Sequence, residues 1–102
     1  MNRLNLLKQA IALTGGVRNK EYGTPEDNLS NIAILWDAYF EAKYGALTVG
    51  QNRPMITAED VAWLNVLQKM ARTFIGSPKP DTYIDAAAYS AIAGECADGE
   101  TD

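Results

Sequence analysis

Hydrophobic residues recur at intervals of three or four along most of the chain, which is the spacing of one face of an α-helix. The first such run predicts a helix over residues 2–13. The sequence TGG at 14–16 ends it, and Gly15 or Gly16 is expected to form a left-handed C-cap there. Sustained alternation of apolar and polar residues, which would indicate a half-buried strand, is absent from the sequence. The pattern therefore predicts an all-α domain with no sheet of more than two short strands.

A second helix is predicted over residues 25–44, and the sequence TPED at 24–27 marks its start. Thr24 is expected to cap it and Pro25 to occupy its first position, while the two acids that come next face the positive end of the helix dipole. Its expected buried stripe consists of Leu29, Ile32, Ala33, Trp36 and Phe40. The middle of this helix is apolar almost all round, which indicates a second covered surface. We therefore expect a homo-oligomer, a dimer or a tetramer, with a contact at or near Ile34, Leu35 and Tyr39.

Two further helices are predicted after a loop at 45–56. The third covers 58–74 and begins at TAED, with Thr57 as cap and Asp60 at the third helical position. Its expected inward residues are Val61, Leu64, Leu67, Ala71 and Phe74. The sequence GSPKP then turns the chain into a fourth helix over 81–96, with inward residues Ile84, Ala87, Ala88, Ala91 and Ile92. The four helices predict a single bundle-like domain over residues 1–97, followed by an acidic tail, 98–102, that is expected to be disordered.

Composition narrows the classes of function. With 9 Lys and Arg against 13 Asp and Glu, the net charge of −4 disfavours binding to duplex nucleic acid, which requires an excess of basic side chains. The chain has no histidine and one cysteine, so a disulfide framework within the chain is excluded and a structural zinc site is disfavoured. No apolar run reaches the length of about 18 residues that a membrane span needs, and the N-terminus lacks the features of a signal peptide. We therefore expect a cytoplasmic protein with no membrane association.

Candidate chemistry gathers at the junction of the third and fourth helices. Asp81, Asp85 and Tyr89 are spaced four residues apart and share one helical face. Lys69 and Arg72 lie near the end of the third helix, and a short connector in a helical hairpin would place them beside those acids. One interpretation is an interhelical salt-bridge cluster with Asp81 as the helix cap. The other is a charged pocket in which the acids bind Mg²⁺ or a sugar hydroxyl and the two basic side chains hold phosphate.

The connector between the first two helices carries a second informative group, Arg18, Lys20 and Tyr22. A tyrosine beside a glycine can stack on a base and an arginine can pair with phosphate, although solvated loop residues explain this composition equally well. Without histidine, a general base would have to be an acid, a lysine or a tyrosine. The sharpest hypothesis is that a single ligand-binding pocket is formed by Arg18, Tyr22, Lys69, Arg72, Asp81, Asp85 and Tyr89.

Four segments in order carry a family resemblance: R-x-x-x-YGTPEDN-x-x-x-IA-x-LW-x-AY at 18–39, IT-x-EDVA at 56–62, K-x-AR at 69–72 and D-x-YIDAAAY at 81–89. Over about residues 18–95 the chain resembles a family of small, uncharacterised phage and prophage proteins. More distantly it is similar to the all-α nucleotide pyrophosphohydrolases of the MazG-like and dimeric dUTPase group. That resemblance implies MazG-like helical hairpins that assemble as an oligomer around a nucleotide.

The resemblance also shows where this chain departs from those enzymes, which hold Mg²⁺ with an E-E-x-x-E motif on one helix and E-x-x-D on the next. The third helix here has acids only at its capped start, Glu59 and Asp60, while Asp81 and Asp85 could stand in for the second motif. We therefore expect a phage protein of the host cytoplasm that binds and sequesters a nucleotide or nucleotide-derived signal, as an antidefence protein would. The alternatives are a nucleotide pyrophosphohydrolase, the one case that would need Mg²⁺ as cofactor, and a host-protein interaction module that uses the exposed aromatic residues of the second helix.

Overall fold

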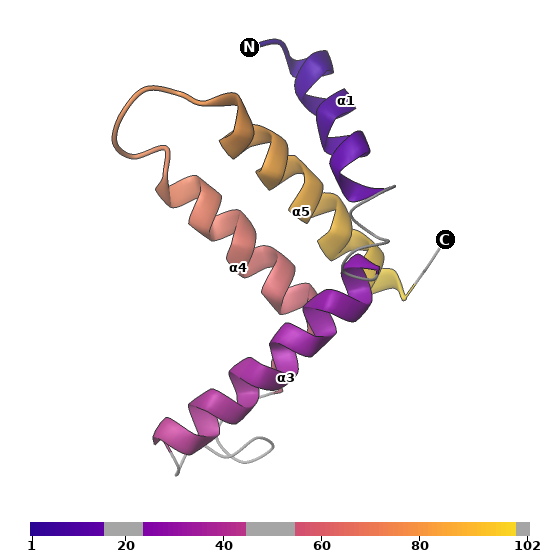
Figure 1. The fold of residues 1–102 in the computed structure, drawn as a ribbon, viewed down its shortest axis with the longest axis vertical. Helices are drawn as coiled ribbons and strands as arrows, with labels where there is room; N and C mark the ends of the chain where they lie inside the picture. Colours follow the sequence, from indigo (N-terminus) through magenta and orange to yellow (C-terminus); the bar gives the residue numbers. More distant parts are fainter. Residues whose placement is uncertain (16–23, 45–54, 100–102) are drawn as a thin grey trace.

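The structure, a computed structural model, describes residues 1–15, 24–44 and 55–99. These ranges contain four helices and no strand: α1 (Arg3–Thr14), α3 (Pro25–Tyr44), α4 (Ala58–Ala71) and α5 (Pro80–Asp98) (Figure 1). The all-α prediction is confirmed, and so is each of the four expected helices, although α4 ends three residues early. Most of the predicted 45–56 loop and the last residues of the expected acidic tail lie outside the described ranges. None of the described helices is long and apolar enough to cross a membrane.

Two helix starts, those of α3 and α4, agree with the predicted caps. At α3, the Thr24 hydroxyl accepts a hydrogen bond from the backbone N–H of Asp27 at 3.2 Å. At α4, Thr57 and Asp60 form a capping box, in which each side chain accepts a hydrogen bond from the other residue's backbone N–H, at 3.2 and 2.9 Å. Capping depends on neighbouring residues alone, and for this reason the sequence predicts these two starts closely.

Two predictions about helix ends are wrong. Gly15 comes after α1 with extended backbone, φ −129° and ψ −174°, so it is not the left-handed cap that was expected, and Gly16 lies outside the described ranges. Asp81 does not cap α5, because Pro80 takes the first helical position and moves the N-cap to Lys79, which makes no side-chain capping bond. A left-handed cap is present instead at Gly99, φ 74°, which ends α5.

The helices are arranged around α5. α4 and α5 form an antiparallel hairpin, and α1 packs along the other side of α5 (Figure 1). α3 crosses the hairpin near the beginning of α4, and its second half extends beyond the other helices. The closed end of the hairpin, formed by residues 72–79, therefore lies far from the extended end of α3.

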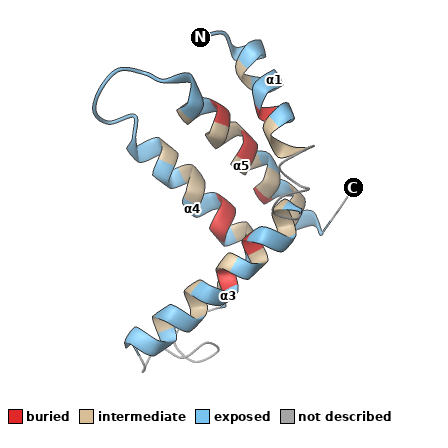
Figure 2. Ribbon diagram, in the orientation of Figure 1, coloured by how far each residue is buried: buried red, intermediate tan, exposed pale blue. Residues whose placement is uncertain are grey.

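The core is small and divided into two clusters (Figure 2). One lies where α3, α4 and α5 meet, and its buried residues are Leu29, Ala33, Val61, Ala62 and Ala93. The other joins α1 to α5 through Ala10, Ile84 and Ala88. Five of these eight buried residues are alanines, so the helices approach one another closely but bury little apolar area per residue.

The predicted buried stripe of α3 is confirmed: Leu29 and Ala33 are buried, and Ile32, Trp36 and Phe40 are partly buried. The predicted inward face of α4 is wrong except for Val61. The side chains of Leu64, Leu67 and Phe74 are 41, 55 and 75 % exposed, and Ala71 is exposed as well. Likewise Ala91 of α5 is exposed while Ala93 is buried. Both helices carry apolar residues on more than one side, so periodicity could not select the side that packs.

Candidate functional site

An ion pair joins the two helices of the hairpin. Lys69 Nζ on α4 lies 3.0 Å from Asp85 Oδ2 on α5, and the two side chains are only 13 and 28 % exposed. The sequence predicts that a hairpin brings the basic end of the third helix beside the acids of the fourth. This ion pair agrees with that expectation. Each of these two charges neutralises the other. The pair therefore joins the two helices and positions the connector at the hairpin's closed end.

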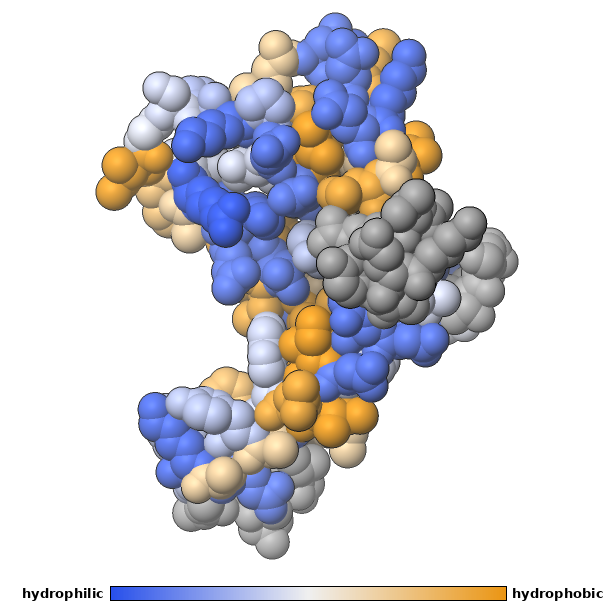
Figure 3. Space-filling view, in the orientation of Figure 1, coloured by the Kyte–Doolittle hydropathy of each residue, from blue (hydrophilic) through white to orange (hydrophobic). Residues whose placement is uncertain are grey.

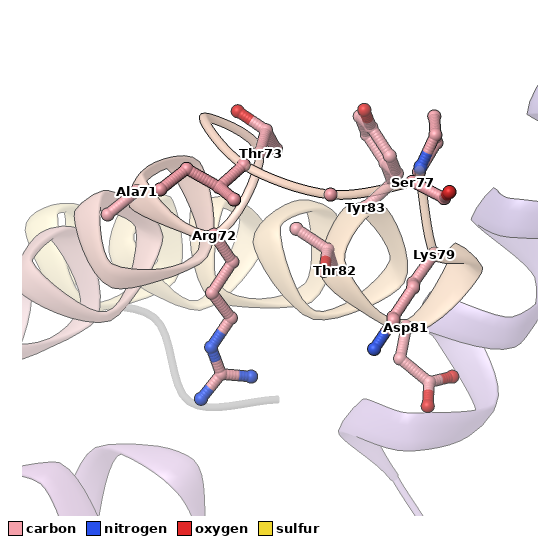
Figure 4. A pocket seen from close by; sticks show the side chains of 11 residues that line it. Ala71, Arg72, Thr73, Ser77, Lys79, Asp81, Thr82 and Tyr83 are labelled. Carbon is pink, nitrogen blue, oxygen red and sulfur yellow. The ribbon is translucent and has the colours of Figure 1, made fainter.

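A cavity of about 580 Å³ lies at that closed end. Its lining comes from Arg72 after α4, from Thr73, Ser77 and Lys79 in the connector, and from the first turn of α5. Figure 4 shows the Arg72, Lys79 and Asp81 side chains projecting toward one side of the connector, with Thr73 and Tyr83 toward the other. No ion pair joins Arg72, Lys79 or Asp81 to any residue of the described ranges. The cavity therefore presents two cations and one carboxylate, none of which has an ion-pair partner among the described residues.

The N-terminus of α5 adds positive character to the same cavity. Its N-cap residue, Lys79, makes no side-chain capping bond, and Pro80 has no N–H to donate. In the first turn, the Thr82 N–H reaches only the Lys79 carbonyl, at 3.2 Å. In contrast to α3 and α4, this helix has no side-chain cap, and Asp81 is the one acidic residue in its first turn.

The structure places some residues of the single-pocket hypothesis at the cavity and others away from it. Arg72 and Asp81 line the cavity, and Lys69 and Asp85 form the neighbouring ion pair. Tyr89 is half-buried two turns further along α5 and does not line the cavity. Arg18 and Tyr22 lie outside the described ranges, so their part of the hypothesis stays a prediction.

Sequence reasoning missed Lys79 and Tyr83 as cavity residues. The sequence GSPKP indicates a turn, yet its lysine directly precedes a proline at the first helical position. Lys79 is therefore a basic residue at an N-cap, where Ser, Thr, Asp or Asn is usual. That exception to the capping preference was the available signal.

A second charged region lies at the opposite end of α5. Burial raises the pKa of the Cys96 thiol, and the nearby carboxylates of Glu26, Glu95 and Glu59 raise it further. Glu26 Oε2 is buried with no hydrogen-bond partner among the described residues. Within the ranges that the structure describes, no three acidic or cysteine side chains are arranged to hold a metal ion.

The described helices thus define an all-helical domain with a charged cavity at the closed end of a helical hairpin. The chain belongs to the family called domain of unknown function DUF6378, whose sequence pattern matches residues 5–97. It is 34 % identical to the gene 55 protein of Mycobacterium phage D29 over 86 residues, which cover 84 % of this chain and 49 % of the relative. It is 33 % identical to the gene 55 protein of Mycobacterium phage L5 over 89 residues, 87 % of this chain and 50 % of the relative. The chain therefore spans about half the length of these relatives.

These matches confirm the resemblance to a family of phage proteins. No solved structure matches the chain. The more distant similarity to MazG-like enzymes stays a prediction.

Proposed function

We propose that this phage-family protein binds a nucleotide or a nucleotide-derived signal in the cavity at the α4–α5 connector. The observation that carries the proposal is that Arg72 and Lys79, without ion-pair partners in the described ranges, project to one side of the cavity beside the uncapped start of α5. A guanidinium donates paired hydrogen bonds to phosphate, an ammonium adds a point charge, and a helix N-terminus favours an anion.

Other cavity residues suit the rest of such a ligand. Tyr83, 40 % exposed on the opposite side of the connector from Arg72, offers a ring on which a base can stack. Thr73 and Ser77 supply hydroxyls, and Asp81 can accept hydrogen bonds from a ribose. The volume of about 580 Å³ lies inside the range of roughly 300–1,000 Å³ that is typical of small-molecule sites. An extended nucleotide could therefore place phosphate and base on the two sides of the connector.

Binding without hydrolysis agrees better with the carboxylates than a Mg²⁺-dependent pyrophosphohydrolase does. Of the two acids available for a metal, Asp85 already pairs with the Lys69 ammonium, which competes with a cation for the same oxygen. A protein that holds a nucleotide signal without turning it over would lower its free concentration in the host cytoplasm. The proposed role is therefore sequestration, of the kind that an antidefence protein performs.

The test is a thermal-shift panel of nucleoside mono-, di- and triphosphates and cyclic dinucleotides, each with Mg²⁺ and with a chelator. A ligand present at ten to a hundred times its Kd adds about 1.4 to 2.7 kcal/mol to the free energy of unfolding. For a domain of this size, each kcal/mol raises Tm by roughly 4–8 °C. Chromatography of the same mixtures distinguishes a binder, which returns the ligand unchanged, from a hydrolase, which consumes it only with Mg²⁺. If no compound shifts Tm, the proposal is wrong.

A further inference from the structure

The connector between α4 and α5 exposes two large apolar side chains at its tip. Phe74 is 75 % exposed and Ile75 is 89 % exposed, the two highest values among the large hydrophobic side chains of the described residues. Figure 3 shows hydrophobic residues at the surface there, with hydrophilic residues beside them. Exposed apolar side chains that lie together within a polar rim indicate an interaction surface, whereas single ones do not.

Basic side chains flank this tip on both sides. Arg72 precedes it and Lys79 follows it, and neither has an ion-pair partner among the described residues. Ile75 lines the same cavity as both of them, so the apolar and basic side chains are neighbours in space as well as in sequence. Among the described residues of that lining, Asp81 is the one acid. We call Arg72, Phe74, Ile75 and Lys79 together the basic–apolar tip.

The α4–α5 hairpin carries opposite charges at its two ends. Its open end, where α4 begins and α5 ends, is acidic and carries Glu59, Asp60, Glu95 and Asp98. The last turn of α5 contains no basic residue. The net charge of −4 therefore does not describe the basic–apolar tip at the closed end. A negatively charged surface would attract this tip and repel the open end, which orients the molecule with the tip toward that surface.

A bilayer surface that contains anionic lipids suits this combination of side chains. Apolar side chains gain free energy below the headgroups, while lysine and arginine keep their charges at the level of the lipid phosphates. Tyr83, which is 40 % exposed at the same cavity, has the amphipathic ring that favours a membrane–water interface.

Other macromolecular partners suit the tip less well. A standard protein–protein contact takes about 800 Å² from each partner, more than the two apolar side chains of the tip supply. A single-stranded nucleic acid stacks its bases on aromatic rings, and Ile75, the more exposed of the two, offers none.

We infer that the basic–apolar tip docks on the surface of a membrane that contains anionic lipids. Phe74 and Ile75 lie below the headgroups in this arrangement, and Arg72 and Lys79 lie at the phosphates. Such attachment needs no spanning helix. It departs from the expectation of no membrane association, because the sequence predicted Phe74 to face inward and the structure exposes it. Lipid docking goes beyond the proposed nucleotide binding and does not depend on it, although both kinds of phosphate would meet the same two basic side chains.

The first test is sedimentation of the full chain with sucrose-loaded vesicles in the absence of nucleotide. Vesicles of phosphatidylcholine mixed with phosphatidylglycerol are expected to bind the protein. Vesicles of phosphatidylcholine alone should bind it much less, and high salt should weaken the binding. Ile75→Ser is expected to lower the partition coefficient roughly 10-fold or more, because a serine gains nothing from entering the apolar layer.

The matched control is Ile34→Ser, the same change at a 65 % exposed position on α3, and it should leave the partition coefficient unchanged. A parent protein that does not bind the anionic vesicles overturns the inference. Equal losses in the two isoleucine variants, or no loss in Ile75→Ser, overturn it as well.

A second measurement locates the contact. Ile75→Cys in a Cys96→Ser background carries an environment-sensitive fluorophore, whose emission is expected to move to shorter wavelength with the anionic vesicles. Ile34→Cys in the same background should show no such shift. Equal shifts at both positions, or none at residue 75, contradict the inference. A shift at residue 75 with a single-stranded oligonucleotide and not with vesicles would assign the tip to nucleic acid instead.

Lipid docking and nucleotide binding can be tested separately. If nucleotides raise Tm and no vesicle binds, lipid docking alone is wrong; if vesicles bind and no nucleotide raises Tm, the proposed function alone is wrong. Phe74 does not line the cavity, so Phe74→Ser should lower vesicle binding and leave the nucleotide-dependent shift in Tm unchanged. A Phe74→Ser variant that keeps vesicle binding and loses the nucleotide-dependent shift would overturn the inference.

Discussion

The Lys69 ammonium lies 3.0 Å from the Asp85 carboxylate, across the line of contact between α4 and α5. Lys69 lies in the last turn of α4 and Asp85 in the second turn of α5, so the pair joins the two helices close to the cavity. The charged residues of the hairpin thereby separate into two groups. Lys69 and Asp85 pair with each other, and Arg72, Lys79 and Asp81 have no ion-pair partner among the described residues at the cavity.

Removing one partner of this ion pair should cost more than removing a surface charge. Lys69→Met leaves the partly buried Asp85 carboxylate unpaired, with an expected loss of about 1.5–3 kcal/mol in the free energy of unfolding. Asp85→Asn should behave similarly, and the double variant should lose less than the sum of the single variants. Lys8→Met on the exposed side of α1 is the control and should change stability by less than about 0.5 kcal/mol. Urea unfolding measures all four, and strictly additive losses would show that the two side chains do not interact.

The helices could be predicted from the sequence because their boundaries depend on local chemistry. Thr24 and Thr57 cap the helices that directly follow them, and these bonds involve no distant residue. The packed side of α4 could not be predicted, because apolar residues lie on both sides of the helix and the larger pair, Leu64 with Leu67, is not the one that packs. The choice between them depends on which side meets α3 and α5, and small alanines allowed the closer approach.

The candidate site was predicted in part for the same reasons. A short connector places the end of α4 beside the start of α5. This alone brings Lys69 next to Asp85, and it places Arg72 and Asp81 at the same cavity. Tyr89 shares a helical face with those acids, but a helix rises about 1.5 Å per residue, so eight residues carry it roughly 12 Å away from Asp81. Spacing along one face shows direction and not distance from a site.

The capping box of α4 gives a direct stability prediction. Thr57→Ala removes the acceptor of the Asp60 N–H and should lower the free energy of unfolding by about 0.5–2 kcal/mol. Thr57→Ser keeps a hydroxyl at the same position and serves as the matched control, with most of the stability retained. Thermal and urea unfolding provide the measurement. Equal losses in the alanine and serine variants would mean that the methyl group, and not the hydrogen bond, is responsible.

The Cys96 thiol should titrate above the ordinary cysteine range. Its pKa is raised first by burial and then by the charge of Glu26, because both disfavour the thiolate. The folded state therefore holds its proton at pH values where the unfolded chain loses it, so stability falls as the pH rises above the ordinary cysteine pKa. The pH profile of alkylation by iodoacetamide should give an apparent pKa above that of an unstructured cysteine peptide.

Glu26→Gln removes one of these charges and should move the Cys96 alkylation profile to lower pH. Glu41→Gln, at an exposed position in the extended half of α3, removes the same charge away from the thiol and should leave the profile unchanged. If the two variants shift the profile equally, net charge and not the proximity of Glu26 raises the pKa.

Arg72 and Lys79 should contribute to ligand binding without contributing to the fold. Neither has an ion-pair partner among the described residues, so removing either charge leaves no described group newly unpaired. With the nucleotide that shifts Tm most, Arg72→Ala should weaken binding roughly 10- to 150-fold, the loss of a charged hydrogen bond worth about 1.5–3 kcal/mol. Arg72→Lys keeps the charge but loses the paired donors, and should recover only part of the affinity. Lys79→Ala should weaken binding as well, whereas Lys8→Ala removes the same charge from the exposed side of α1 and should not.

Calorimetry gives the affinities, and circular dichroism shows whether each variant is folded. Were Arg72→Ala to destabilise the free protein and leave nucleotide binding intact, Arg72 would be a structural residue and the ligand would have to bind elsewhere.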